Sequence, residues 1–450
     1  MDRIAEKISD YAASFTYTDL TPEALHAVKR SLIDSIGCAL GAFSAEPVKI
    51  ARRLAARVQC SMPASILGTF MKTSPEMAAF VNGIMVRYLD FNDDYLNKDG
   101  PHPSDNISAL LAICEALHTN GKSLACGITL AYEIVDQLVD SAEFHSRGWD
   151  YVTETSIGSA LGVGNMLGLS QEKMAQALAL AIAPNIGLWQ TRTGELSMWK
   201  GCAGPNAARN GLFAALLASE GMTGPNQIFE GRCGLMKQVT GPFELGVFGG
   251  KGHPFKIEGT FFKYRPVMYT VLLSVETALE LRKKVDIHQI DSIRVFLDSF
   301  SIATSSGPEK YDPHTRETAD HSIPYLVVAA LFDGEISERT YTPERYRHPQ
   351  ILALLKKSSM EEDPQYTKEW PKTFHCRIEV VDLSGRQWIQ HLKNPKGHPA
   401  NPMSDDEIEE KFLKLTQNLL TSTQAQNTLE LLWHLEEMED VNRIFNAVLI

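Results

Sequence analysis

The sequence lacks the cysteine spacing of a disulfide framework or a structural zinc site. Its seven cysteines are scattered through 450 residues, and no two of them form a CxxC pair. An odd number of dispersed cysteines in apolar surroundings is typical of thiols that act as small buried apolar groups. We therefore expect no disulfides, no metal site and no iron–sulfur cluster.

Long apolar runs are also missing. No stretch of about 18 residues is free of charges and helix breakers, as a membrane-spanning helix requires. The first fifteen residues contain Asp2, Glu6 and Asp10. A secretory signal needs a longer apolar run, and a transit peptide is poor in acidic residues. These features predict a cytoplasmic protein with no membrane partner.

The chain has fewer basic than acidic residues. The chain has 43 Lys and Arg against 55 Asp and Glu, which gives a net charge of −12 with neutral histidines. Such a chain repels polyanions, which argues against a nucleic-acid partner. An acidic protein that acts on a small anion must gather its cations locally, so lysines and arginines in apolar surroundings are informative.

Apolar residues are plentiful, at 44% of the chain, and the length suggests about two domains. Apolar residues recur with helical spacing through about residue 265. Several of these helices have clear start signals, in which a capping hydroxyl comes directly before the first helical residue, as at Thr21, Ser74 and Ser170. The segment 206–219 is rich in Ala and Leu on all sides and is expected to be buried.

The pattern changes near Pro266. Residues 287–300 alternate as in a strand, and residues 375–383 and 387–391 form a predicted hairpin that turns at Gly385. Helices are expected over 316–331 and 343–356, and Ser404 is expected to cap a final set of helices. We predict a mainly α protein with an all-helical domain (1–265 and 400–450) and a smaller α+β lid domain (266–399).

The segment from Leu89 to Asn106 carries the clearest chemical signal. Acidic residues follow an apolar helix, and a loop then places His102 between two prolines, which fix the backbone. Ser104, Asp105 and Asn106 cap the next helix, whose first amides favour an anion. From these residues alone two interpretations stay open: a general acid–base site, or a capped surface loop with solvated carboxylates.

Four segments together resemble the MmgE/PrpD family, which includes 2-methylcitrate dehydratases, cis-aconitate decarboxylases and iminodisuccinate epimerases. They are LDFND with HPSDN, GELSMWKGCAGPNAARNG (194–211), FFKYRP (261–266) and ADHSIPYLVVAAL (319–331). The resemblance implies a helical domain plus an α+β lid, a homodimer, and an active site between the two domains. The catalytic residues that it implies are Asp90, His102, Lys200, Lys263 and Tyr325.

The chemistry of these residues suits a small tricarboxylate or dicarboxylate substrate. Lysines stabilise the negative charge that builds up when a proton leaves the carbon beside a carboxylate. We expect His102 to transfer that proton, Asp90 to orient the imidazole, and Tyr325 to bond a carboxylate or protonate the leaving hydroxyl. The scheme needs no metal or cofactor. Arg192, Arg265 and His321 are further candidates for substrate binding.

Several of these candidates also have a structural interpretation. Lys263 lies between two aromatic residues. Its position is explained equally well if the aliphatic stem packs at the end of a helix or strand and the ammonium group reaches water. Tyr325 on an apolar helix suits core packing, and arginines such as Arg192 and Arg265 most often form surface ion pairs. For these positions the resemblance favours the functional interpretation.

Two positions depart from the family pattern. Asp94 stands where relatives commonly have Thr or Ser, and an ionised Asp accepts hydrogen bonds but repels a carboxylate. Tyr151 stands where dehydratase-type members often have His after Gly-x-Asp. Both positions remain candidates for substrate binding, and both leave the identity of the substrate open.

The resemblance implies the dehydration of 2-methylcitrate or a longer 2-alkylcitrate. The alternatives are decarboxylation of cis-aconitate and epimerisation of an iminodisuccinate-type substrate, since all three reactions pass through a carbanion beside a carboxylate. A non-catalytic helical scaffold is the alternative from another class. A scaffold would be free to lose its site cations, yet Lys200, Lys263 and His102 are all present.

Overall fold

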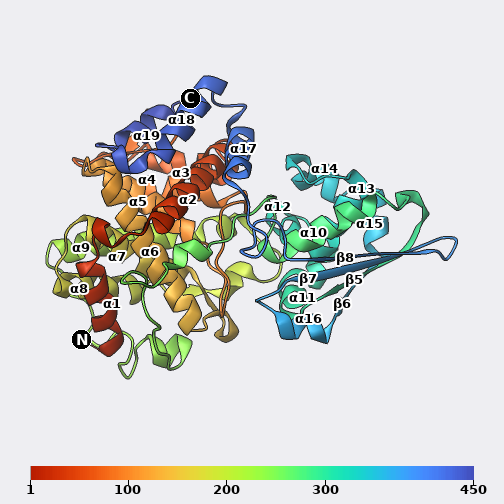
Figure 1. Ribbon diagram of the computed structural model, residues 1–450, viewed down its shortest axis with the longest axis horizontal. Coiled ribbons are helices and arrows are strands. Elements are labelled where there is room, and N and C mark those ends of the chain that lie inside the picture. The colour runs from red at the N-terminus through yellow and green to blue at the C-terminus, as the bar shows by residue number, and fades with distance from the viewer. Residues whose placement is uncertain (1) are drawn as a thin grey trace. The chain divides into compact units, whose positions relative to one another are not determined.

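The computed structural model describes residues 2–450 and divides into two compact units (Figure 1). The helical unit consists of the chain up to Trp189, Gly201–Thr260 and Ser404–Ile450. The sheet unit consists of Gln190–Lys200 and Phe261–Met403. The prediction of a mainly α protein with a small sheet is confirmed.

The helical unit is built from helices that the N- and C-terminal parts of the chain both supply. Its helices are α1 (Arg3–Ser14), α2 (Pro22–Gly41), α3 (Glu46–Ala55), α4 (Pro75–Arg87), α5 (Ile107–Ala116), α6 (Gly121–Ser141), α7 (Val152–Met166), α8 (Gln171–Ile182), α9 (Ala203–Ser219), α17 (Asp405–Thr416), α18 (Ser422–Trp433) and α19 (Asn442–Ala447). Two short strand pairs join β1 (Ala64–Ser65) to β2 (Lys72–Thr73) and β3 (Trp149–Asp150) to β4 (Gly187–Leu188).

The predicted start signals operate as expected. The hydroxyls of Thr21, Ser74 and Ser170 each accept a hydrogen bond from a backbone amide in the first turn of α2, α4 and α8. The helix α7 packs against α6 and α9 at the centre of the unit, and α17 packs against α2. The last part of the chain therefore completes the fold begun by the first.

The sheet unit contains a four-stranded sheet in the order β6-β5-β7-β8. Its elements are α10 (Tyr269–Arg282), β5 (Ile290–Leu297), α11 (Ser299–Ser305), α12 (Arg316–Ala319), α13 (Ile323–Asp333), α14 (Pro343–Tyr346), α15 (Pro349–Leu355), β6 (Ser358–Glu362), α16 (Pro364–Glu369), β7 (His375–Asp382) and β8 (Gln387–Lys393). The helix α10 packs on β7 and β8, and α13 packs on α10. The predicted hairpin is confirmed, with Gly385 at a positive φ of 84° in its turn.

Two predictions for this unit are wrong. The helix expected over 316–331 breaks into α12 and α13, because Ser322 caps α13 and Pro324 lies in its first turn. The helix expected over 343–356 breaks into α14 and α15, because Pro349 begins α15 and disfavours a helical conformation of the residue before it. The strand β6, which pairs in parallel with β5, was not predicted at all. The first break forms the turn that holds Asp320 and His321, both of which are buried.

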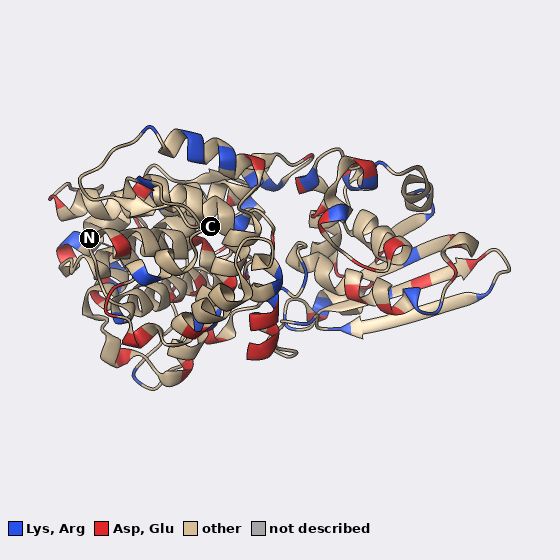
Figure 2. Ribbon diagram, turned by 90° about the horizontal axis from the view of Figure 1, so that it is seen from above, with Lys and Arg blue, Asp and Glu red and all other residues tan. Residues whose placement is uncertain are grey.

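Charged residues of both signs and free thiols occur in both units. Lysine and arginine are interspersed with aspartate and glutamate along both units (Figure 2). All seven cysteines are free thiols, and five of them are buried, as expected for small apolar groups. Within residues 2–450 no helix has the length and apolar character needed to cross a membrane.

Candidate active site

His102 is buried and held in one orientation by the loop between α4 and α5. Its Nδ1 lies 2.6 Å from the main-chain oxygen of Asp93. A carbonyl oxygen can only accept, so Nδ1 carries the hydrogen and Nε2 is the nitrogen that can accept a proton. The Oδ1 of Asp90 lies 3.9 Å from Nε2, and the Oδ2 of Asp94 lies 3.4 Å from Nδ1. The structure thus fixes the tautomer of this imidazole.

The side chain of Asp93 stabilises this loop through hydrogen bonds. Its carboxylate accepts hydrogen bonds from the Ser104 amide (3.0 Å) and from the hydroxyl of Tyr132 on α6 (2.7 Å). Burial raises the pKa of Asp93 to about 6, although both donors act to lower it. Asn92 donates to the Ser104 hydroxyl at 2.9 Å and completes the arrangement. The motif is therefore a buried network, and the interpretation as a solvated surface loop is wrong.

Asp90 is paired with an arginine that the sequence reasoning missed. The backbone of Asp90 has a φ of 51°, and its Oδ1 accepts a 2.5 Å hydrogen bond from Nη1 of Arg87 at the end of α4. Burial disfavours the charge of Arg87, but the Asp90 carboxylate and the Tyr151 hydroxyl raise the pKa of this guanidinium well above its ordinary value. An Arg three residues before an Asp was the available signal. We call Arg87, Asp90, Asp94 and His102 the histidine cluster.

Tyr151 lies beside the histidine cluster. Its ring meets the His102 ring edge-on, with centroids 5.7 Å apart, and its side chain is 4% exposed. The phenol occupies the position at the start of α7 where the resemblance led us to expect a histidine. The structure thus brings together four of the predicted residues in the helical unit: Asp90, Asp94, His102 and Tyr151.

Buried acids surround this cluster. Burial raises the pKa of Asp136 on α6 and of Glu154 on α7 well above their ordinary values, which favours their neutral forms. Gly204 opens α9 close to Asp105, and a Cβ at that glycine would lie 1.9 Å from Asp105 Oδ2. Gly204 is thus required for the carboxylate of Asp105 to approach the N-terminus of α9.

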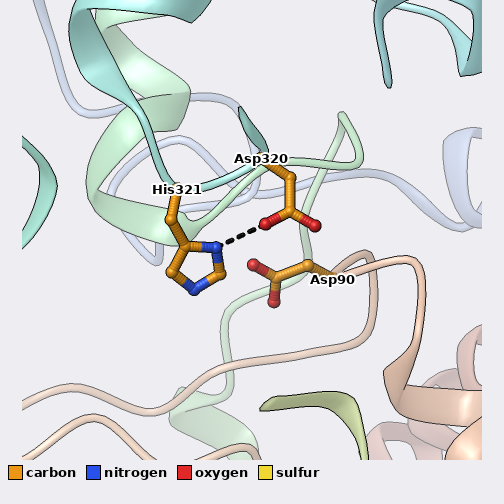
Figure 3. A group of neighbouring side chains, drawn as sticks. All are labelled: Asp90, Asp320 and His321. Carbon is orange, nitrogen blue, oxygen red and sulfur yellow. Dashed lines mark hydrogen bonds and ion pairs between the residues drawn. The ribbon is translucent and has the colours of Figure 1, made fainter. Parts of the chain in front are cut away.

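In the sheet unit, Lys200 binds a buried carboxylate. Its Nζ lies 3.3 Å from both carboxylate oxygens of Asp320, which follows α12. The Nδ1 of His321 donates to Oδ1 of the same carboxylate at 2.5 Å, as Figure 3 shows. Lys200 is 1% exposed, and Asp320 is equally buried. We call Lys200, Asp320 and His321 the lysine cluster. Asp320 was not predicted, although it lies directly before His321 in a motif that we had singled out.

The segment before Lys200 is fastened to α12. The Leu196 amide donates to the Thr318 hydroxyl at 2.9 Å, and the Thr315 hydroxyl donates to the Leu196 carbonyl at 2.9 Å. Arg192, predicted to bind substrate, donates through Nη1 to the Lys200 carbonyl at 2.9 Å. These bonds hold the backbone of Lys200, so one visible role of Arg192 is to position that lysine.

The other predicted residues of the sheet unit lie in different surroundings. Lys263 is fully buried near the point where the Phe262 amide donates to the Gly397 carbonyl. The guanidinium of Arg265 lies 5.5 Å from the Tyr264 ring centroid. Tyr325 is fully buried in α13, and its hydroxyl donates to the Thr340 carbonyl at 2.5 Å. The hydrogen of the Tyr325 hydroxyl is therefore already engaged.

Comparison with known proteins agrees with this architecture over most of the chain. Residues 6–247 match the MmgE/PrpD N-terminal domain, and residues 266–437 match the MmgE/PrpD C-terminal domain. A human (Homo sapiens) protein named cis-aconitate decarboxylase is 25% identical over 442 residues, which cover 94% of this chain and 89% of the relative.

Two further relatives carry the names of dehydratases. A 2-methylcitrate dehydratase of Salmonella typhimurium is 27% identical over 393 residues, covering 82% of this chain and 79% of the relative. An alkylcitrate dehydratase of a fungal species is 27% identical over 466 residues, covering 91% and 87%. Both halves of the sequence match the two family domains in the right order, and the chain therefore belongs to the MmgE/PrpD family.

Proposed function

We propose that this protein is a lyase that removes water from 2-methylcitrate or a related 2-alkylcitrate to give the corresponding cis-aconitate. The observation that carries the proposal is the orientation of His102, whose Nδ1 donates to the Asp93 carbonyl, so that Nε2 is the nitrogen that can accept a proton. Relatives named 2-methylcitrate dehydratase and alkylcitrate dehydratase support the choice of substrate.

The proposed reaction uses the histidine cluster as the proton-transfer group. His102 Nε2 takes a proton from the carbon beside a carboxylate, and Asp90 stabilises the imidazolium that forms. The carbon–oxygen bond to the hydroxyl then breaks, the carbon–carbon double bond forms, and one of the buried ammonium groups protonates the departing hydroxide. One water and one alkene result, so the atoms balance.

The buried lysines stabilise the negative charge in this scheme. Lys200 and Lys263 are almost completely buried, where an ammonium group interacts with a carboxylate far more strongly than in water. His321 and Arg192 are proposed to support binding through Asp320 and the Lys200 backbone. Tyr325 can accept a hydrogen bond while it donates to Thr340, and Arg265 is proposed to contribute positive charge.

Asp94 and Tyr151 are proposed to shape specificity. Asp94 is buried beside His102 and can only accept hydrogen bonds when ionised, so it suits a donor such as a substrate hydroxyl rather than a carboxylate. The Tyr151 hydroxyl can donate to an oxygen of the substrate. We further propose that the enzyme acts without a cofactor, as a homodimer, in the cytoplasm.

Decarboxylation of cis-aconitate is the second candidate. The relative named cis-aconitate decarboxylase covers 94% of this chain, and the same cations would stabilise the carbanion left by departing carbon dioxide. An iminodisuccinate-type epimerase would use the same intermediate. A scaffold without activity would not need the cations and the oriented imidazole that the chain retains.

A direct assay separates these candidates. The purified full chain is incubated with 2-methylcitrate and, separately, with cis-aconitate, and the products are measured by mass spectrometry. Loss of water from 2-methylcitrate, with the appearance of alkene absorbance in the ultraviolet, is the expected result. Loss of carbon dioxide from cis-aconitate alone would favour the decarboxylase, and no product from either substrate would contradict both proposals.

A further inference from the structure

Lys310 is a buried cation that neither the sequence motifs nor the proposed reaction uses. It lies in a short 3₁₀ helix, Pro308–Tyr311, and is 2% exposed. Its Nζ has no hydrogen-bond partner among residues 2–450. Burial lowers the pKa of this ammonium, which is the expected response of a lysine without a counter-ion. A buried cation of this kind is uncommon unless something neutralises it.

The backbone of Lys310 is tied to the turn that carries the lysine cluster. The Ser322 hydroxyl donates to the Lys310 carbonyl at 2.6 Å and accepts from the Tyr325 amide at 3.0 Å. Ser322 directly follows Asp320 and His321, so one side chain joins Lys310 to the start of α13. The backbone of Lys310 is thus held beside the turn that carries the lysine cluster.

The carboxylates near Lys310 are engaged elsewhere or only partly buried. The negative charges of Glu309 and Asp320 both favour its protonated form. The oxygens of Asp320, however, are already engaged by Lys200 and His321. Glu309 is only half-buried, and its carboxylate lies back against Gly307. The ammonium group of Lys310 therefore has no carboxylate to itself in the described part of the chain, and an added anion would supply the missing partner.

We propose that Lys310 is a substrate-binding residue that pairs with a carboxylate of the bound tricarboxylate, as a further cation beside the lysine cluster. The inference rests on the proposed function for the class of ligand. The positive charge of Lys310 is the feature that binds the ligand: the described residues give the ammonium group no hydrogen-bond partner, and a carboxylate of the ligand supplies one.

The test measures binding without turnover. Tricarballylate has three carboxylates but no hydroxyl, so it cannot lose water, and its affinity for the full chain is measured by calorimetry. Lys310→Met removes the charge and keeps the shape, while Lys310→Gln keeps a hydrogen-bond donor. Lys356→Met changes an exposed lysine of the same unit and serves as the control.

We expect the affinity for tricarballylate to fall about tenfold or more in both Lys310 variants and to stay unchanged in the control. Without ligand, Lys310→Met should unfold at the same temperature as the wild type or a higher one, because an unpaired buried charge has been removed. The rise in melting temperature that tricarballylate produces in the wild type should be largely lost in both Lys310 variants.

Three results would overturn the inference. They are affinities within about twofold of the wild type in Lys310→Met, wild-type affinity in Lys310→Gln, or a wild type that binds no tricarballylate. Turnover of 2-methylcitrate with Lys310-independent binding would leave the proposed function standing and remove the inference alone. If binding depends on Lys310 but the protein converts neither substrate, the inference stands and the proposed function is removed.

Discussion

The histidine cluster and the lysine cluster are built on opposite charge patterns. In the helical unit, His102 has two carboxylates nearby, Asp90 and Asp94, and Arg87 pairs with one of them. In the sheet unit, the carboxylate of Asp320 is bound by Lys200 and His321. Carboxylates near an imidazole favour its protonated form, whereas cations near a carboxylate favour its ionised form.

This difference fits two separate roles, proton transfer for the histidine cluster and attraction of an anionic substrate for the lysine cluster. A substrate with several carboxylates would be repelled by the acids of the histidine cluster and attracted by the lysines. A proton-transfer group, by contrast, benefits from acids that stabilise its charged form. Substitutions in the two units test this difference, and the largest effect is expected at His102.

Replacing His102 should abolish most of the activity. In His102→Gln the side chain can still bond the Asp93 carbonyl but cannot carry a proton between substrate atoms. We expect kcat for 2-methylcitrate to fall by about 10²–10⁴-fold, with the melting temperature nearly unchanged. His314→Gln changes an exposed histidine and is the control. A His102→Gln enzyme with full activity would remove this residue from the mechanism.

Replacing Lys200 should damage both stability and activity. Lys200→Met leaves the buried Asp320 carboxylate without its ammonium partner, which should cost about 3–5 kcal/mol of unfolding free energy in urea. The double variant Lys200→Met with Asp320→Asn should regain most of this stability but not kcat/KM. Recovery of activity in the double variant would show that the positive charge of Lys200 is not required.

Replacing Asp93 should change how stability depends on pH. The pKa of Asp93 is raised from its ordinary 3.8 to about 6 in the folded protein, so the wild type loses stability as pH rises through this interval. Asp93→Asn should remove that loss. The stability of the variant relative to the wild type should therefore rise between about pH 4 and 6, by at most about 1.4 kcal/mol per pH unit.

Urea unfolding at several pH values measures this effect. Asp291→Asn changes an exposed aspartate in β5 and should give no such slope. A difference between Asp93→Asn and the wild type that is flat with pH would mean that Asp93 ionises normally.

Replacing Tyr325 should have the smallest effect on chemistry. Tyr325→Phe leaves the Thr340 carbonyl without its donor and should cost about 1–3 kcal/mol of stability, with kcat retained within about tenfold. Tyr341→Phe removes a similar bond to the Pro266 carbonyl and is a matched control. An activity loss as large as that of His102→Gln, without a matching loss in Tyr341→Phe, would place the Tyr325 hydroxyl in the reaction.

Local signals in the sequence predicted many of the elements correctly. Capping hydroxyls and prolines located the starts of α2, α4 and α8, and Gly385 located the hairpin turn. The same kind of signal was overlooked inside 316–331, where Ser322 and Pro324 begin a new helix. The parallel pairing of β5 with β6 joins segments far apart in the chain, so no local pattern could reveal it.

By itself, then, the sequence determined the helices with strong caps, the family, and the residue types available for acid–base chemistry and charge stabilisation. Only the tertiary structure decided which charges are paired. Arg87 and Asp320 proved to be the partners of Asp90 and Lys200, while Lys310 was left without one. The reason is physical: capping and turn formation depend on neighbours along the chain, but the cost of a charge depends on burial and on partners brought from distant segments.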